Sequence, residues 1–393
     1  MQKSLRKNFN DQFSKEDYFN IIHTIKKSCE SEIDFSIAET PIFIEKDFKN
    51  KMLDTCEYII DFILDKDFKT ITARSIPKNN NLPGEDEHPQ MLVFDFGICQ
   101  DKHNELSPQL IEMQGFPSLF GFQICLDDAT RLHHAVPASY DSFLNGYDKE
   151  RYLQVLKDII IGDENIENVI LLEIYPDQQK TKIDFKCMEK IFGIKTICFT
   201  KIKAEGAQLF YLEEGNKIVI KRIFNRIIFD DIKQYDLEDF IDLKQQYDVT
   251  WIPHPNWFYR ISKFTLPFLR HQYIPETYFL NEVKMPLPLE DYVLKPLFSY
   301  AGLGVIIDVT EEDMLKIKDP GNWILQKKVN YAPIIETPDE PAKAEIRLFY
   351  FWKNGWERPI AIHNLARLSK GKMIGTRYNE NENWVGGTIA YFE

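Results

Sequence analysis

Several features that would place a protein quickly are missing from this chain of 393 residues. It has no apolar run approaching the roughly 20 residues that a membrane-spanning helix needs, so we expect no membrane partner. The first ten residues are basic and polar with no apolar stretch behind them, so no secretory leader is expected. The six cysteines are scattered without Cys-x-x-Cys spacing. That pattern predicts reduced thiols, a cytoplasmic location and no zinc site.

An excess of positive charge is also missing. Lys and Arg number 48 against 61 Asp and Glu, which gives a formal charge of −13. Nucleic-acid binding draws much of its affinity from neutralised phosphates, so we expect no nucleic-acid partner. A nucleotide can still bind in a locally basic pocket, because the local field matters more than the sum. Nothing in the sequence indicates an oligomeric state.

The hydrophobic patterns that are present predict an α/β (α+β) protein with more than one domain. A predicted helix at 152–161, an apolar strand at 168–175, a helix at 182–192 and a strand at 194–200 form one βαβ unit, which indicates a small parallel sheet. We expect a helical N-terminal region with strands that complete a later site, a small parallel α/β substrate domain, and a nucleotide-binding region. Their ranges are 1–150, 151–250 and 251–393.

Outside the βαβ unit, helical spacing predicts helices at 1–30, 48–64 and 261–270. Apolar density predicts strands at 91–98, 109–114, 277–280, 291–296, 304–309, 323–329, 344–352 and 385–392. We expect residues 333–341 to form an exposed loop and residues 369–384, which are rich in Gly and Asn, to be mobile.

One stretch in the third region has the residue types that phosphate binding needs. A predicted strand delivers Lys295, and a loop with Ser299, Gly302 and Gly304 follows it. Small residues leave backbone N–H groups accessible to an anion, and the lysine supplies a fixed cation nearby. The loop lacks the Gly-Lys-Ser/Thr of a P-loop. Taken alone, a hairpin that merely contains glycines is an equally good interpretation.

The flanks of this stretch add a second pattern. Lys263 opens a predicted helix some thirty residues earlier, Glu345-Ile-Arg347 lies on a later strand, and Arg367 follows. This order resembles the ATP-grasp superfamily. The resemblance implies that Lys263 and Lys295 contact ATP phosphates, that the loop with Ser299, Gly302 and Gly304 covers them, and that Arg347 and Arg367 act in catalysis. It also implies an adenine contact from the segment Gln326-Lys327-Lys328-Val329.

Candidate metal ligands lie early in the chain. Asp95 is in one predicted strand, and Glu112-x-Gln114 is in the next. Strand alternation puts Glu112 and Gln114 on one face, and Mg²⁺ prefers carboxylate and carbonyl oxygens together with ATP phosphates. We therefore predict Mg²⁺ ligands at Asp95, Glu112 and Gln114. A structural hydrogen-bonding role for Asp95 is an equally good interpretation.

An early Glu-x-Gln and a late lysine–glycine segment together resemble the circularly permuted ATP-grasp group, eukaryotic-type glutathione synthetase and glutathionylspermidine synthetase. The resemblance spans roughly residues 40–393 as scattered short motifs and implies a permuted ATP-grasp fold with a small Rossmann-like substrate domain. Gln114 stands where the family has Asn, and Lys327 stands near an acidic metal ligand of that family. The segment after Glu173 lacks the family's substrate pattern, so glutathione is not supported as the product.

The resemblance implies an ATP- and Mg²⁺-dependent ligase that joins a small-molecule or peptide carboxylate to an amine through an acyl phosphate. Two alternatives stay open. The departures at Gln114 and Lys327 also fit a non-catalytic nucleotide-binding or scaffold protein derived from such a ligase. The same fold also suits phosphoryl transfer to a hydroxyl group.

Overall fold

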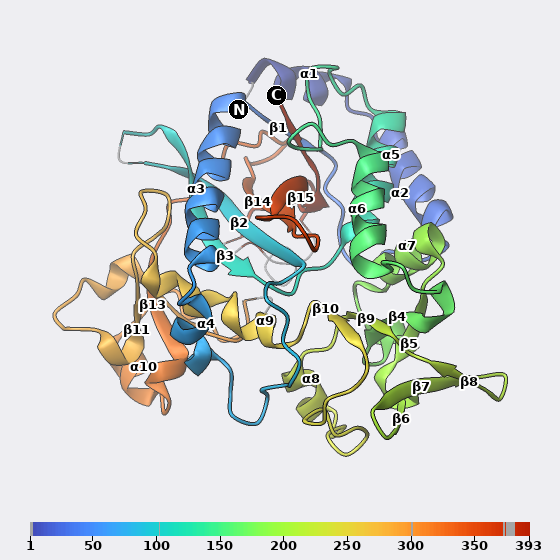
Figure 1. Ribbon diagram of the computed structural model, residues 1–393. Coiled ribbons are helices and arrows are strands. Elements are labelled where there is room, and N and C mark those ends of the chain that lie inside the picture. Colours follow the sequence, from blue (N-terminus) through green and yellow to red (C-terminus); the bar gives the residue numbers. More distant parts are fainter. Residues whose placement is uncertain (1–2, 102, 300–301, 372–373, 375–381) are drawn as a thin grey trace.

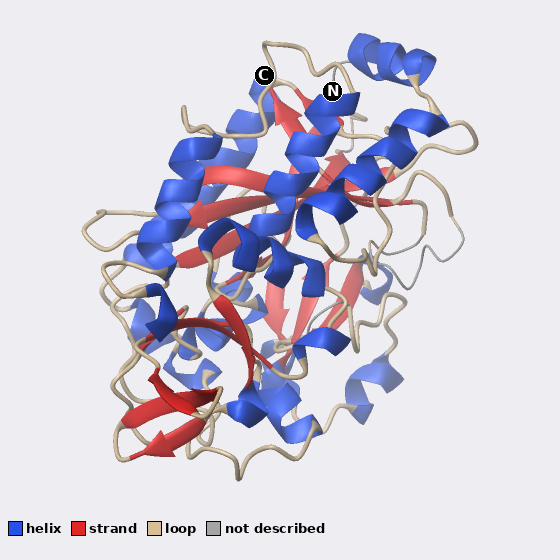
Figure 2. Cartoon of the chain, turned by 90° about the vertical axis from the view of Figure 1, so that its right-hand side faces the viewer, coloured by secondary structure: helices blue, strands red, loops and turns tan. Residues whose placement is uncertain are grey.

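The computed structural model describes residues 3–101, 103–299, 302–371, 374 and 382–393 (Figure 1). The chain is a mixed α/β protein, in which the described strands form five sheets. Figure 2 shows helices packed around these strands. The helices are α1 (Lys3–Gln12), α2 (Lys15–Cys29), α3 (Lys46–Leu64), α4 (Phe68–Ile71), α5 (Phe120–His133), α6 (Lys149–Ile160), α7 (Lys182–Phe192), α8 (Phe229–Gln234), α9 (Asn256–Arg260) and α10 (Glu311–Lys316).

The largest sheet joins strands from both ends of the chain. Its order is β16-β15-β14-β2-β3, and every neighbouring pair is antiparallel. The strands are β2 (Met91–Gln100), β3 (Leu106–Gln114), β14 (Lys343–Phe351), β15 (Ile360–Ser369) and β16 (Gly386–Thr388). Because β2 lies between β3 and β14, early residues of the chain lie directly opposite late ones.

The two faces of this sheet are covered by different helices. Phe94 and Ile346 on one face belong to a core that includes the apolar side of α3. Val93 and Phe349 on the other face belong to a second core, with α5 and α6. Because side chains alternate along a strand, this second face continues along β2 from Val93 to Asp95. Buried charge thus lies just beyond the apolar core.

A smaller antiparallel sheet has the order β11-β13-β12 and lies at the lower left of Figure 1. Its strands are β11 (Thr277–Phe279), β12 (Tyr292–Pro296) and β13 (Trp323–Lys327). The prediction of a strand at 304–309 is wrong, because this segment forms only one isolated β-bridge, between Ile306 and Leu294. The helix predicted at 261–270 is instead the 3₁₀ helix η5 (Lys263–Phe268), in which Pro267 cannot donate an α-helical hydrogen bond.

A parallel sheet with the order β10-β9-β4-β5 is present in the middle of the chain. Its strands are β4 (Val169–Glu173), β5 (Lys195–Cys198), β9 (Arg222–Asn225) and β10 (Thr250–Ile252). Helix α7 connects β4 to β5 and ends at Gly193, whose φ of 74° is left-handed. A separate antiparallel ribbon contains β6 (Lys203–Glu205), β7 (Gln208–Glu213) and β8 (Asn216–Val219). Strands of the first and third regions share the large sheet. The three-region division itself stays a prediction.

The two ends of the chain are tied together. Strand β1 (Ile42–Ile44) pairs in parallel with β17 (Ala390–Phe392). The single strand predicted at 385–392 is therefore two short strands, β16 and β17, with Ile389 between them. Much of the segment 369–384, which we expected to be mobile, lies outside the described residues.

The prediction of reduced thiols is wrong for two of the six cysteines. Cys29 at the end of α2 and Cys187 in α7 form a disulfide across 158 residues of sequence. Sequence spacing could not indicate this pair, because only helix packing brings the two residues together. None of the described helices is both long and apolar enough to cross a membrane.

Candidate functional site

A network of charged side chains lies on the large sheet, at the end of the face that α5 and α6 cover. Asp95 on β2 is opposite Arg347 on β14. Arg347 donates from Nε and Nη2 to the two Asp95 oxygens, each at 2.6 Å. Arg367 on β15 donates from Nη2 to Asp95 Oδ2 and to Glu345 Oε2, both at 2.9 Å. Paired guanidinium–carboxylate contacts of this kind hold both arginines in defined orientations.

Glu112 extends the network onto β3, where it lies opposite Asp95. Its carboxylate is 3.6 Å from Lys263 Nζ and 3.9 Å from Arg347 Nη2, and it accepts a 2.6 Å hydrogen bond from Gln114 Nε2. Burial raises the pKa of Glu112, but Lys263 and Arg347 outweigh it and bring the pKa down to about 2. Glu112 is therefore ionised at neutral pH.

A close backbone approach brings Lys263 to Glu112. Gly115 follows β3, and a Cβ placed on it would lie 2.6 Å from the carbonyl oxygen of Trp257. Gly115 N also donates to Ile261 O at 2.9 Å. Helix η5 begins two residues later, with Lys263 as its first residue. A side chain at position 115 would separate β3 from this segment, so glycine is required for the ion pair.

The second predicted phosphate lysine lies in the smaller sheet. Lys295 Nζ donates to Gln326 Oε1 at 2.6 Å, from β12 to β13. Burial lowers the pKa of Lys295 to about 8, while Glu112 raises it and Lys263 lowers it further. These interactions place Lys295 in the same charged network. Lys263 Nζ also donates to Ser299 O at 2.7 Å, so the start of the glycine loop joins it too.

Among the residues that the structure describes, the contacts of the other predicted nucleotide-binding residues lie outside the charged network. Gly302 and Gly304 have φ values of 72° and 75°, which favour glycine. The exposed Lys327 side chain points to the opposite face of β13 from Gln326. Lys328 Nζ lies 3.6 Å from Asp308 Oδ1, and Val329 is half-buried beyond the strand end.

The structure thus brings together most of the predicted site residues, and the contacts described above do not join Gly302, Gly304, Lys327, Lys328 or Val329 to them. Those in the network are Asp95, Glu112, Gln114, Lys263, Lys295, Gln326, Arg347 and Arg367, with the Ser299 carbonyl. Their roles stay predictions.

Sequence reasoning did not assign a role to Glu345. Its carboxylate accepts from Arg367 and from the Tyr331 hydroxyl. Burial raises the pKa of Glu345, against the opposing effect of Arg367. The sequence could have indicated this role, because Glu345 and Arg347 are two residues apart and strand alternation places both side chains on one face.

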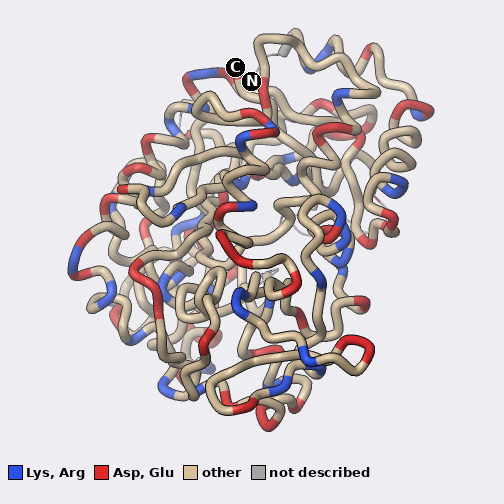
Figure 3. The backbone as a smooth tube through the Cα atoms, turned by 45° about the vertical axis from the view of Figure 1, so that its right-hand side comes forward, with Lys and Arg blue, Asp and Glu red and all other residues tan. Residues whose placement is uncertain are grey.

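Two buried donors in the network have no hydrogen-bond partner among the described residues. They are Gln326 Nε2 and Arg367 Nε. Buried polar groups are nearly always paired, so such donors indicate a place for a ligand or water. Lys263, Lys295, Arg347 and Arg367 face the carboxylates of Asp95, Glu112 and Glu345, which leaves one positive charge in excess. Elsewhere, charges of both signs are spread along the whole chain (Figure 3).

The loop that follows Gln114 is held by the parallel sheet and its helix. Asp184 on α7 accepts from the N–H groups of Gly121 and Phe122 at the start of α5, at 3.0 and 2.9 Å. Arg226 after β9 donates from Nη1 to Pro117 O at 2.8 Å. Burial raises the pKa of Glu173 to about 7, although Arg226 opposes it. These contacts fix the exit of β3 against the middle region of the chain.

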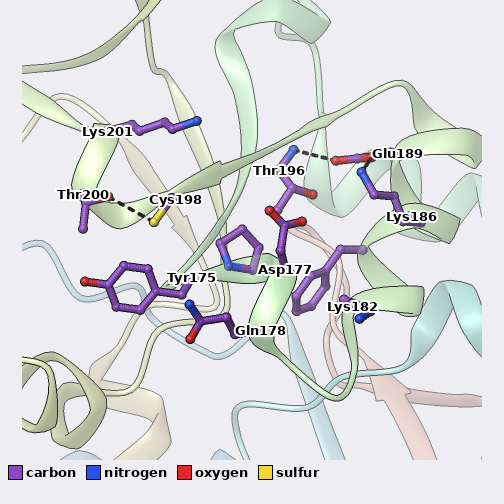
Figure 4. Close-up of a pocket in the computed structure, with 12 residues that line it drawn as sticks. Tyr175, Asp177, Gln178, Lys182, Lys186, Glu189, Thr196, Cys198, Thr200 and Lys201 are labelled. Atoms are coloured by element: carbon purple, nitrogen blue, oxygen red, sulfur yellow. Dashed lines mark hydrogen bonds and ion pairs between the residues drawn. The ribbon is translucent and has the colours of Figure 1, made fainter. Parts of the chain in front are cut away.

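A cavity of about 450 Å³ opens in that middle region (Figure 4). It lies beyond the carboxyl ends of β4 and β5, where open parallel sheets usually bind ligands. Tyr175, Asp177 and Gln178 line it after β4, Lys182 comes from α7, and Lys201 follows β5. The cavity shares no residue with the charged network, so it is a second candidate binding region. It lies within the range 151–250 that we expected to form a substrate domain, but sequence analysis did not predict its lining, which depends on how α7 packs.

Of the comparisons with known proteins, only the one with solved structures gives matches. No protein-family model and no curated protein matches this chain. A solved structure does match, the apo form of a glutathione synthetase-like effector from Globodera pallida, with a TM-score of 0.57. The match has 11% identity and covers 96% of this chain and 97% of that one. At this identity it shows the fold alone, so this chain is a mixed α/β protein whose fold is similar to that of a glutathione synthetase-like effector.

Proposed function

We propose that this chain is an ATP- and Mg²⁺-dependent carboxylate–amine ligase with a circularly permuted ATP-grasp fold. The observation that carries the proposal is the network itself. Lys263, Lys295, Glu112 and Arg347 come from four separated parts of the sequence, yet they interact in one place. The similarity to a glutathione synthetase-like fold supports the same proposal.

The residues present fit a nucleotide. Lys263 and Lys295 would hold the phosphates, and the loop with Gly302 and Gly304 would cover them. The unpaired Gln326 Nε2 and the segment up to Val329 would meet the adenine. Lys295 is buried against Gln326 with a lowered pKa, so an anion beside it would stabilise its charged form.

The residues also fit a magnesium ion, with Glu112 as its main protein ligand. Glu112 is ionised, half-buried, and next to Gln114 on the same face of β3. Both Asp95 oxygens accept from arginines, so a metal role for Asp95 requires that one of these contacts loosen. When bound, Mg²⁺ would neutralise charge on the phosphates during phosphoryl transfer.

Arg347 and Arg367 would stabilise the charge that develops as a substrate carboxylate becomes an acyl phosphate and an amine attacks it. Asp95 and Glu345 hold both guanidinium groups in place before substrate arrives, and such preorganisation is a main source of catalysis. The cavity beside β4 and β5 combines Lys182 and Lys201 with Asp177, which suits a substrate that carries both carboxylate and amine groups.

A second candidate is a non-catalytic nucleotide-binding or scaffold protein. It is favoured by the full engagement of Asp95 with arginines and by the orientation of the Lys327 side chain away from the network. The matching structure is itself described as an effector. This candidate predicts ATP binding without turnover in any mixture of carboxylates and amines.

The first test is the change in melting temperature with ATP and Mg²⁺, for wild type, Glu112→Ala and Lys295→Ala. We expect a stabilising shift that needs Mg²⁺ and is lost in both variants, since ligand binding stabilises the folded state. Glu105→Ala is the control, because Glu105 is exposed in the turn before β3. Folded variants that keep the full shift would contradict the assignment of the site.

The reaction is tested by product analysis. Wild type is incubated with ATP, Mg²⁺ and panels of amino acids and polyamines, and products are identified by mass spectrometry. An amide together with ADP and phosphate supports the ligase. A stable phosphorylated product without an amide indicates transfer to a hydroxyl group. ATP binding without either product indicates the scaffold.

A further inference from the structure

Three cysteines from three helices meet at a place separate from the charged network. Cys29 ends α2, Cys125 lies in α5 and Cys187 lies in α7, and these helices contact one another (Figure 1). Their sulfur atoms all lie within 4.8 Å of one another. Cys29 and Cys187 form the disulfide, and Cys125 Sγ is 3.4 Å from Cys187 Sγ.

The three sulfurs differ in exposure. Cys29 and Cys187 are only 2% and 1% exposed, so a reductant in solution cannot reach the disulfide directly. Cys125 is half-buried, so it is more accessible to solvent than the two disulfide cysteines. A thiol that contacts a buried disulfide and is itself partly exposed can pass reducing equivalents from an external thiol to that disulfide.

We propose that Cys29, Cys125 and Cys187 form a thiol–disulfide exchange site, through which a low-molecular-weight thiol reduces the buried disulfide by way of Cys125. In the first step Cys125 sulfur attacks Cys187 Sγ. The Cys125–Cys187 bond forms, the Cys29–Cys187 bond breaks, and Cys29 leaves as a thiolate that takes up the proton lost by Cys125. No external oxidant or reductant is consumed in this step.

The second step uses two molecules of the external thiol. The first attacks the half-buried Cys125 sulfur, which forms a mixed disulfide and releases Cys187 as a thiolate. The second attacks the small-molecule sulfur of the mixed disulfide, which releases Cys125 and forms the oxidised dimer of the external thiol. One protein disulfide and two thiols thus become two protein thiols and one small disulfide.

Burial raises the pKa of the Cys125 thiol to about 12, aided by Asp128 and Asp184 and opposed by Lys149 and Lys190. At neutral pH only a small fraction of this thiol is therefore the reactive thiolate. The attack is intramolecular, across 3.4 Å between Cys125 Sγ and Cys187 Sγ, so Cys125 is present at a far higher effective concentration than a dilute external thiol. The internal route therefore competes with a dilute external thiol that cannot reach the buried sulfurs.

The test follows reduction of the Cys29–Cys187 disulfide by 2-mercaptoethanol in the folded protein, with alkylation and peptide mapping as the readout. We expect Cys125→Ser to slow reduction by about tenfold or more, because the relay thiol is gone. Cys198→Ser is the control, since Cys198 is also a free, half-buried cysteine but lies outside the cluster. An unchanged rate in Cys125→Ser would overturn the proposal.

A second variant tests the exchange itself. Oxidised Cys29→Ser should contain a Cys125–Cys187 disulfide, because Cys187 then has one partner within reach. If Cys125 and Cys187 both remain free thiols in the folded, oxidised variant, the proposal is overturned. So would one equivalent of tightly bound zinc that protects all three thiols in the wild type, since that outcome assigns the cluster to a metal. If Cys29→Ser does not fold, the rate comparison with Cys125→Ser decides alone.

Discussion

The charge on Lys295 depends on neighbours that the sequence does not bring close to it. Lysine normally loses its proton near pH 10.5, but burial lowers the pKa of Lys295 to about 8. The cost of burying the cation is present below pH 8 and is relieved as the pH rises towards 10.5. A contact with an ATP phosphate instead needs Lys295 to keep its proton and its positive charge. Stability and ATP affinity should therefore respond to pH with opposite signs.

Lys295 should lose most of its charge between pH 7.5 and 9.5, because this range crosses its pKa. We therefore expect the Kd for ATP to increase on the order of tenfold over this range, which corresponds to about 1.4 kcal/mol of binding free energy. Isothermal titration calorimetry at the two pH values measures it. Lys295→Met should bind ATP more weakly at both values and should lose most of the pH dependence. Lys284→Met, which alters an exposed lysine of the same region, should behave as the wild type. A wild-type Kd that does not change with pH would remove Lys295 from the phosphate site.

At the scale of elements, the contact between β3 and the α9–η5 segment decides whether Lys263 reaches Glu112. Gly115 allows that contact, because a Cβ at this position would lie 2.6 Å from Trp257 O and 3.1 Å from Ile261 Cβ. A neighbouring backbone cannot move aside as a flexible side chain can. The glycine is therefore a requirement of packing and not of backbone conformation.

We expect Gly115→Ala to lower the free energy of unfolding by roughly 1–3 kcal/mol, as overpacking in a dense interior does. It should also weaken the ATP-dependent thermal shift, because Lys263 would be displaced. Urea unfolding and the thermal shift measure the two effects. The control is Gly321→Ala, where a Cβ would meet nothing nearer than 3.7 Å. Equal effects of the two substitutions would show that the close approach is not needed.

At the scale of the whole molecule, the disulfide joins the N-terminal helices to the middle of the chain. Cys29 and Cys187 are 158 residues apart, so the bond closes a long loop in the unfolded chain. In the chain-entropy account, a loop of this length stabilises the folded state by about 5 kcal/mol at most. Much of the stability of the molecule should then depend on redox conditions.

We expect a reductant to lower the free energy of unfolding of the wild type by up to about 5 kcal/mol in urea titrations. The double variant Cys29→Ser, Cys125→Ser should be less stable than the oxidised wild type and should not respond to reductant, because Cys187 then has no cysteine partner within reach. Cys56→Ser, which alters a buried free cysteine, should still respond. A wild type that is equally stable with and without reductant would mean that the bond does not form in solution.

Local periodicity by itself predicted the helix at 182–192, the early helix now bounded as α3, and the placement of Glu112 and Gln114 on one face. These features depend on neighbours only a few residues away, and the sequence contains that information. Strand β15 was not predicted, because its buried polar residues His363 and Asn364 interrupt the apolar density by which the other strands were recognised. The strand expected at 304–309 did not form, because apolar residues alone do not supply a pairing partner.

Only tertiary structure decided the rest. Sequence analysis named Asp95, Glu112, Arg347 and Arg367, but the pairing of β2 between β3 and β14 determined that Asp95 holds both arginines. The cavity beside β4 and the cysteine cluster were equally invisible, because each is assembled from segments that are distant in sequence. Residue type and spacing determine which chemistry the chain can carry. Long-range packing determines which charges meet, because Coulomb energies and pKa values depend on distance in space and on burial.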